Sequence, residues 1–248
     1  MVYKWINNAQ KWLFPTHCDL CLAPTHGSQP ICPGCYRELP WLAPGCTSCA
    51  EPLPTLHPGQ CETCLRHPPA LDACHALFSY QAPVDQWIRR LKFHQELTLA
   101  RLLGGMLAEQ FRASEDAWLV PVPLHPRRLR QRGFNQALEI ARPLQASGYR
   151  IEARCVSRTR DTPPQSKLAA KKRRHNLHDA FTLRHNVSGQ RIVLIDDVFT
   201  TGTTLNTLAA TLKRAGATHV EAWTIAKTPE PDLKNLKGSV PFSSGKGY

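Results

Sequence analysis

The sequence of 248 residues lacks long hydrophobic runs. No uninterrupted apolar stretch reaches the roughly 18 residues that a membrane-spanning helix needs. The most apolar segment, residues 97–107, is shorter and contains Arg101. The first eleven residues hold no apolar stretch of signal-peptide length and no small-residue cleavage site. We therefore expect a protein without a transmembrane helix, located in the cytoplasm.

Acidic residues are scarce in one part of the chain and basic residues in another. The formal net charge is +12. Residues 121–175 contain fourteen Lys or Arg and three Asp or Glu. Residues 1–74 contain four Lys or Arg and five Asp or Glu. This distribution predicts an anionic partner for residues 121–175, with a solvated face or a nucleic-acid arm as the alternatives. It disfavours binding of a phosphate backbone by residues 1–74 and favours a scaffold or protein-docking role there.

Eight of the ten cysteines form four CxxC pairs, separated by ten, ten and eleven residues: Cys18/Cys21, Cys32/Cys35, Cys46/Cys49 and Cys61/Cys64. A CxxC turn directs two thiolates at one tetrahedral ion, and two such turns complete a closed structural zinc site. The spacing predicts two zinc ions, most simply within residues 18–35 and 46–64. An interleaved pairing satisfies the same chemistry and stays open. Cys74 and Cys155 lie outside this array and are expected to be ordinary buried thiols.

The proline-rich segment that carries the pairs has few apolar residues to bury. We expect zinc to supply much of its folding free energy. Before it, Trp5, Ile6, Ala9, Trp12 and Leu13 recur at helical spacing and predict a short amphipathic helix. We expect this helix to dock on the protein's own core, with association with a membrane surface as the alternative.

After residue 74, segments of strand and helix character alternate. Helical periodicity covers residues 84–111 with an interruption at 93–96, then residues 134–144 and 203–215. Strand patterns cover residues 118–122, 180–184, 191–197 and 220–226. Ile192–Ile195 is continuously apolar, as in a central parallel strand covered on both faces. The alternation predicts an α/β fold with a parallel sheet and helices on both faces.

The segment from Arg191 to Leu205, RIVLIDDVFTTGTTL, carries the chemistry. The strand delivers Asp196 and Asp197 at its carboxyl end, where open α/β sheets bind ligands. Hydroxyls and backbone N–H groups of residues 200–204 follow at the start of a helix, a setting that favours a phosphate dianion. Two adjacent carboxylates can bind the vicinal hydroxyls of a ribose, directly or through Mg²⁺. One segment would then hold both the sugar and its 5′-phosphate.

These residues resemble the phosphoribosyl pyrophosphate (PRPP) signature of type I phosphoribosyltransferases, an apolar strand followed by two acids and TTGxT. Residues 120–136, VPVPLHPRRLRQRGFNQ, are similar to the ComF/GntX branch of that fold. So is the later run that contains Arg158, Thr162, Gln165, Leu168, Arg173, Asn176 and Phe181. With the paired cysteines, the resemblance covers roughly residues 15–228, with Lys172 where an acidic residue is common.

The chain is expected to have three parts: an N-terminal helix and double zinc ribbon (residues 1–68), a phosphoribosyltransferase-like domain (69–229) and a disordered tail (230–248). The tail is expected from its Pro, Gly and Ser residues scattered among Lys, and it has no counterpart in the resemblance. By position, residues 121–136 would form the pyrophosphate loop and residues 158–176 a mobile loop that closes over the site. Arg130, Arg132 and Gly133 suit pyrophosphate, with Asn135 orienting the turn. Lys167, Lys171, Arg173 and Arg174 could add charge on closing.

The expected function is binding of PRPP with Mg²⁺, with transfer of phosphoribosyl to an unidentified acceptor if the protein is an enzyme. The expected catalytic residues are Asp196, Asp197, Arg130 and Arg132, and the expected ligand-binding residues are these four with Val198, Thr200, Thr201, Gly202, Thr203, Thr204, Gly133, Asn135, Lys171 and Arg173. The ComF/GntX resemblance implies a link to DNA uptake or use of external DNA, and a DNA-uptake protein as partner. Two alternatives remain: a non-catalytic sensor of PRPP or a nucleotide, and an adaptor that binds single-stranded DNA. Phe134 and Tyr149 are the aromatic residues in the basic segment, which gives the adaptor weak support.

Overall fold

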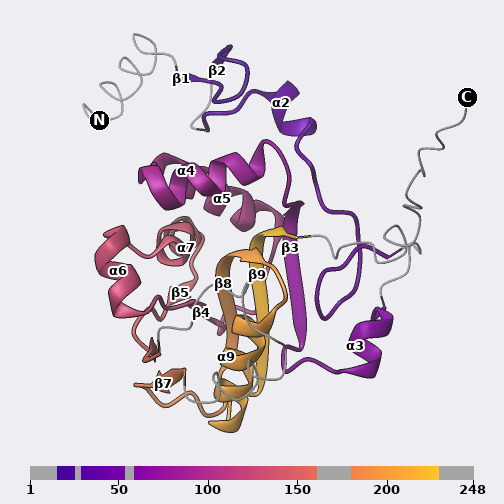
Figure 1. Cartoon of the computed structure of the whole chain (residues 1–248), viewed down its shortest axis with the longest axis vertical. Coiled ribbons are helices and arrows are strands. Elements are labelled where there is room, and N and C mark those ends of the chain that lie inside the picture. Colours follow the sequence, from indigo (N-terminus) through magenta and orange to yellow (C-terminus); the bar gives the residue numbers. More distant parts are fainter. Residues whose placement is uncertain (1–15, 26–28, 54–58, 161–179, 229–248) are drawn as a thin grey trace, which may run out of the picture.

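A five-stranded parallel sheet forms the centre of the protein in the computed structural model, which describes residues 16–25, 29–53, 59–160 and 180–228. The strand order is β3-β9-β8-β4-β5, and every neighbouring pair is parallel (Figure 1). The strands are β3 (Ala73–Ser79), β4 (Trp118–Pro121), β5 (Arg150–Ile151), β8 (Arg191–Phe199) and β9 (His219–Lys227). The predicted α/β class is confirmed.

Helices cover both faces of the sheet, as the apolar run in β8 predicts. Val193 and Ile195 pack into a core shared with α4 (Val84–His94), α5 (Leu97–Gln110) and α7 (Gln136–Ala146). Ile192 and Leu194 pack into a second core with α9 (Thr203–Arg214). Because successive side chains of a strand point to opposite faces, this alternation requires cover on both sides.

The elements outside the sheet are short. A seven-residue helix, α6 (Pro126–Arg132), follows β4. The strands β6 (Val156–Arg158) and β7 (Phe181–Leu183) pair antiparallel beside the main sheet. The helix α7 continues through Pro143 to Ala146, and Ser147 caps it.

Two ribbons with the same local geometry precede the sheet. The first contains β1 (Thr16–His17), β2 (Pro24–Thr25) and α2 (Pro33–Arg37), and the second contains α3 (Glu62–Arg66). In each, the residue after the first CxxC pair has a positive φ, 62° at Leu22 and 57° at Ala50. The second pair begins at the N-cap of the short helix, α2 or α3.

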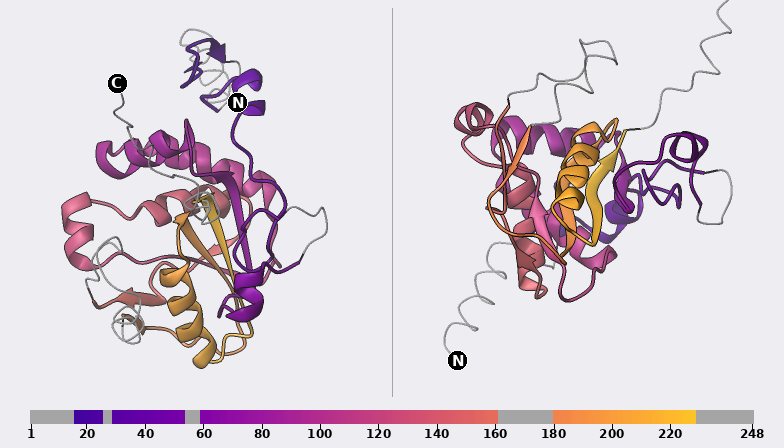
Figure 2. Two further views of the ribbon diagram at one scale, coloured as in Figure 1. Left: turned by 45° about the vertical axis from the view of Figure 1, so that its right-hand side comes forward. Right: turned by 90° about the horizontal axis from the view of Figure 1, so that it is seen from below.

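Both ribbons contact the α/β part, at different places (Figure 2). The first lies against α4, where Asp19 accepts hydrogen bonds from Arg90 and from Trp87 Nε1, the latter at 2.7 Å. The second contacts β3, where Cys74 N donates to Thr47 O at 2.8 Å, and just before this ribbon Leu42 N donates to Leu77 O at 2.8 Å. The segment between the ribbons thus extends the sheet edge that β3 would otherwise expose.

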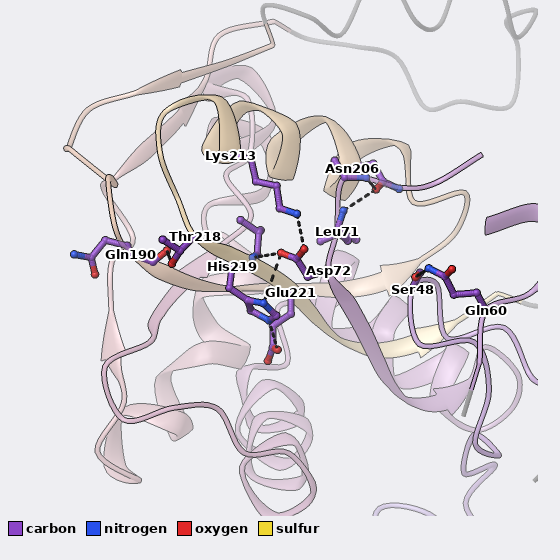
Figure 3. A network of polar contacts seen from close by, with 12 residues as sticks. Ser48, Gln60, Leu71, Asp72, Gln190, Asn206, Lys213, Thr218, His219 and Glu221 are labelled. Atoms are coloured by element: carbon purple, nitrogen blue, oxygen red, sulfur yellow. Dashed lines mark hydrogen bonds and ion pairs between the residues drawn. The ribbon is translucent and has the colours of Figure 1, made fainter. Parts of the chain in front are cut away.

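A polar network fixes the chain between the second ribbon and β3 (Figure 3). Asp72 accepts from Val220 N at 2.8 Å and from Lys213 Nζ at 2.5 Å. Asn206 Oδ1 of α9 accepts from Ala70 N and Leu71 N at 3.0 and 3.3 Å. Hydrogen bonds from Lys213 lower the pKa of Asp72 against the opposing effect of its burial. The chain between the second ribbon and β3 is therefore held by hydrogen bonds to both β9 and α9.

Three predicted features lie outside the described residues: the amphipathic helix near the N-terminus, the mobile loop after residue 160 and the C-terminal tail. Within the described part of the chain, the structure contains no helix that is long and apolar enough to cross a membrane.

Candidate functional site

Two four-cysteine clusters form where the sequence predicts them. Their members are Cys18, Cys21, Cys32 and Cys35 in the first ribbon, and Cys46, Cys49, Cys61 and Cys64 in the second. Within each cluster all sulfur atoms lie within 4.8 Å of one another. The pairing is sequential, which decides between the two arrangements that the spacing allows.

The sulfur geometry fits zinc. The Sγ atoms of Cys21 and Cys32 are 3.7 Å apart, as are those of Cys49 and Cys61. A tetrahedral ion with Zn–S bonds of about 2.3 Å requires sulfur atoms about 3.8 Å apart. Contacts with neighbouring thiols, first Cys32 and then Cys21, raise the pKa of Cys35, so a dication is needed to bind all four as thiolates. The two clusters therefore fit two structural zinc ions.

A cavity of about 340 Å³ opens at the carboxyl ends of the central strands. We call it the strand-end cavity. Its lining comes from the end of β8 and the start of α9, from the segment after β4, and from α4, α6, α7 and β6. Polar lining residues include Lys92, Arg128, Arg132, Gln136, Arg158, Asp196, Asp197, Thr200, Thr203 and Thr204. Four cations around two carboxylates suit a ligand with several negative charges.

The two acids occupy different environments although they are consecutive in β8. Asp197 is 5% exposed, and its Oδ2 lies 2.7 Å from Lys92 Nζ. Asp196 accepts a hydrogen bond from Asp197 N at 2.9 Å. Burial, followed by the charge of Asp197, raises the pKa of Asp196 to about 7. Such a perturbed carboxyl in a cavity is typical of a functional site.

The loop after β8 places the start of α9 in the cavity. Gly202, Thr203, Thr204 and Leu205 all line it. Gly202 has a φ of 68°, and a Cβ at this position would lie 2.4 Å from the ring of Phe199. Only glycine fits both the left-handed backbone and the close approach. The N–H groups of the first helical turn, which lack intrahelical partners, are thus available to an anion.

The segment predicted as a pyrophosphate loop, residues 121–136, is not a loop throughout, because residues 126–132 form the helix α6. His125 caps this helix by accepting from Arg127 N, Pro126 occupies its first turn, and Gly133 ends it with a φ of 84°. At 3.6 residues per turn, Arg128 and Arg132 share the face toward the cavity. Arg130 lies on the opposite, exposed face and is not among the lining residues.

Of the other predicted ligand residues, some line the cavity, some lie outside the lining, and some lie outside the described residues. Val198 lines the cavity with the acids and the threonines. Asn135 lies outside the lining, donates to Val122 O at 3.1 Å and caps α7 by accepting from Ala137 N at 3.0 Å. Gly133 and Thr201 are also outside the lining, and the Thr201 hydroxyl is 2.7 Å from that of Thr203. Lys171 and Arg173, with Lys167 and Arg174, lie outside the described residues.

Four polar lining residues were not among the predicted ligands: Lys92, Arg128, Gln136 and Arg158. Arg128 and Gln136 belong to the basic segment that the sequence singles out. The proline start and glycine end of α6 are the signals that would have placed Arg128 on the same helix face as Arg132. Arg158 begins the second run of the family resemblance. Lys92 belongs to a helix from a distant part of the chain, so no local pattern marks it.

Comparison with known proteins matches two family models. Residues 131–241 match a phosphoribosyl transferase domain, and residues 9–67 match a double zinc ribbon domain.

Three relatives illustrate the curated matches. The chain is 34% identical over 224 residues to "DNA utilization protein YhgH" of Escherichia coli (strain K12), covering 85% of this chain and 90% of that protein. It is 33% identical to "Competence protein F" of Haemophilus influenzae, with 67% and 78% covered. It is 27% identical to "Competence protein ComFC" of Streptococcus pneumoniae, with 61% and 67% covered.

Proposed function

Because the chain belongs to the ComF/GntX family of phosphoribosyltransferase-like proteins with a double zinc ribbon, we propose that its strand-end cavity binds PRPP. One observation carries the proposal: the acid pair and the start of α9 face a single cavity. A sugar with a 5′-phosphate presents two hydroxyls and a dianion, and these match the two features.

Each part of PRPP has its proposed partners. Asp196 and Asp197 accept the ribose hydroxyls, and residues 198–204 hold the 5′-phosphate. Arg128, Arg132 and Arg158 face the space left for pyrophosphate. Asn135 orients the segment after β4 through its hydrogen bond to Val122 O. Arg130, Gly133, Lys171 and Arg173 are further proposed contacts of the pyrophosphate that rest on the family resemblance and not on the cavity lining.

The proposed reaction is displacement at C1 of the ribose. A nucleophile forms a bond to C1 while the C1–O bond to pyrophosphate breaks and its electron pair leaves with the pyrophosphate. Positive charge develops on the ribose and negative charge on the leaving group. Guanidinium groups already fixed around the leaving group stabilise that charge without reorganisation.

The donor set also suits Mg²⁺. The ion prefers carboxylates together with substrate phosphates, and Asp196 supplies a carboxylate in the cavity. Bound with PRPP, Mg²⁺ would neutralise charge on the pyrophosphate. Asp196 is the residue that would hold it.

A non-catalytic sensor would use the same cavity. Pyrophosphate release separates the two cases, because an enzyme releases it from PRPP when an acceptor is present and a sensor does not. Relatives named for DNA utilisation and competence support a role in DNA uptake or use of external DNA, with a protein of that machinery as partner. The reduced thiols that two zinc ions require favour the cytoplasm as its compartment.

Thermal unfolding tests the ligand assignment. A ligand that binds the folded state alone raises the melting temperature with concentration. We expect PRPP with Mg²⁺ to do so, whereas glucose 6-phosphate, which carries a phosphate on a six-membered sugar, should have no effect. An equal rise of the melting temperature with both ligands would mean that the cavity binds anions in general and does not recognise PRPP.

A second candidate function is binding of single-stranded nucleic acid at the cavity rim. Phe93 is 69% exposed, and the guanidinium of Arg132 lies 5.9 Å from its ring centroid. Arg127 and Arg130 are exposed on α6 nearby. Aromatic rings that stack bases beside arginines are typical of such sites. Binding should weaken steeply with salt and with Phe93→Ala, and should survive loss of the two aspartates.

A further inference from the structure

Lys92 forms a close charged contact with the acid pair. Its Nζ lies 2.7 Å from Asp197 Oδ2, and the side chains are 22% and 7% exposed. The ion pair with Lys92 is the contact that this oxygen makes, since it has no hydrogen-bond partner among the described residues. The ammonium group of Lys92 therefore occupies the place beside Asp197 Oδ2 where a bound cation would otherwise lie.

The position of Lys92 is fixed on both sides along α4. Leu91, directly before it, is fully buried. Arg90 is held by Asp19 of the first ribbon and by Glu96, with Nη2–Oε2 of the latter pair at 2.6 Å. Gln95 then ends the helix in a left-handed conformation. The backbone that carries Lys92 is thus anchored, and its side chain extends into the cavity lining.

The acid pair needs a positive charge close by. Two carboxylates on consecutive residues repel each other, and burial strengthens that repulsion. Among the described residues, Lys92 supplies an ammonium at hydrogen-bonding distance from one of them. The remaining charge on Asp196 then faces a cavity whose other cations lie toward α6 and β6.

We propose that Lys92 is a positioning residue that serves as the built-in cation of the acid pair, so that the pair accepts the ribose hydroxyls directly and needs no divalent ion to bind a sugar monophosphate. This inference rests on the proposed function and deepens it. Mg²⁺ is then required only for a ligand that carries pyrophosphate, such as PRPP. Removal of Lys92 should create a need for a divalent ion that the wild-type protein does not have.

Ribose 5-phosphate is the appropriate probe, because it lacks the pyrophosphate that itself binds Mg²⁺. It is titrated calorimetrically into the full-length, zinc-loaded protein, once in magnesium-depleted buffer and once with excess Mg²⁺. No chelator is used, because chelation would strip the ribbons. The same titrations are made with Lys92→Met, with the charge-conserving Lys92→Arg, and with Arg128→Met.

The wild-type protein should give the same dissociation constant in both buffers. Lys92→Met should bind at least about tenfold more weakly without Mg²⁺ and recover most of that loss with it, because a buried carboxylate is left without its cation. Lys92→Arg should keep the magnesium-independent behaviour. Arg128→Met removes a positive charge from the same cavity and leaves the Lys92–Asp197 ion pair in place, so its loss of affinity should be equal in the two buffers.

The outcomes separate the two proposals. Binding by the wild type that requires Mg²⁺, or magnesium-independent binding by Lys92→Met, would overturn the role of Lys92 and leave the cavity assignment intact. Failure of ribose 5-phosphate to bind the wild type in either buffer would instead overturn the proposed function and this inference with it. Thermal unfolding of each variant confirms its fold, and Lys92→Gln replaces Lys92→Met if the latter does not fold.

Discussion

The carboxylate of Asp19, between two predicted zinc ligands, accepts hydrogen bonds from both terminal nitrogens of Arg90, at 2.6 and 2.8 Å. Arg90 lies two residues before Lys92, which contacts Asp197 in the strand-end cavity. The first ribbon thus contacts α4, the helix that carries Lys92, through Asp19 and Arg90, and α4 contacts the acid pair through Lys92.

Asp19→Asn should destabilise the protein and weaken ligand binding. Burial opposes ionisation of Asp19, but hydrogen bonds from Arg90 and Trp87 prevail and lower its pKa. Loss of the charge should reduce the free energy of unfolding by about 1–2 kcal/mol. This is the contribution of a hydrogen bond between charged groups, lowered because Arg90 is partly exposed to solvent. Urea unfolding measures the change. Glu62→Gln breaks the exposed pair with Arg66 and is the control, expected to cost no more than about 0.5 kcal/mol.

Gly202→Ala should abolish binding of ribose 5-phosphate. The added Cβ meets the Phe199 ring and forces the start of α9 to move. Gly189→Ala is a matched control, because Gly189 also has a positive φ, 78°, but no atom lies within 4 Å of its added Cβ. Both variants carry the backbone cost of about 1–2 kcal/mol. Calorimetry should show that only Gly202→Ala loses the ligand; equal losses would mean that backbone strain alone explains the effect.

Zinc analysis should give about two ions per chain. The sequence predicts that removing zinc unfolds residues 15–68 and leaves much of the α/β part folded, and the division at residues 68/69 remains a prediction. The contacts in the structure favour a wider effect. Buried Lys227 lies 2.6 Å from Glu51 of the second ribbon, and its ammonium lies 5.6 Å from the Phe199 ring centroid. We expect chelation to weaken binding of ribose 5-phosphate as well as to unfold the ribbons; undiminished affinity after complete zinc removal would show that the parts are independent.

Asp196→Asn should stabilise the unliganded protein above neutral pH. In the folded protein the pKa of Asp196 is raised from 3.8 to about 7, chiefly by burial. As the pH rises between these values, the unfolded chain loses its proton while the folded chain retains it, so stability falls. Asparagine does not titrate. The variant should gain about 1–3 kcal/mol at about pH 8 and little at about pH 4, measured by urea unfolding. A gain that is independent of pH would contradict the raised pKa.

The central strand and the chemistry at its end could be predicted because both are local. Apolar residues fill β8, Asp196 and Asp197 follow them, and the Thr/Gly loop then begins α9. The cysteine spacing likewise predicted two four-cysteine clusters, and the folded structure then decided that their pairing is sequential. The short segment of α6 was misjudged because its seven residues are dominated by arginine, which conceals a proline start and a glycine end.

The rest depended on contacts between distant parts of the chain. The strand pattern of β3 is weak, because His75 and Ala76 interrupt its apolar residues, and its place at the sheet edge comes from pairing with β9 and from the segment that contains Leu42. Lys92 reaches Asp197 across more than a hundred residues of sequence. No periodicity reports such a pair, so the cation of the acid pair could be found only in the folded structure.

The most direct test of the central claim is calorimetric titration of PRPP with Mg²⁺ into the wild-type protein and into the double variant Asp196→Asn/Asp197→Asn. The account predicts saturable binding by the wild type. It predicts loss of that binding in a double variant that is still folded, because the carboxylates that accept the ribose hydroxyls are gone. No binding by the wild type, or equal affinity in the two proteins, would contradict it.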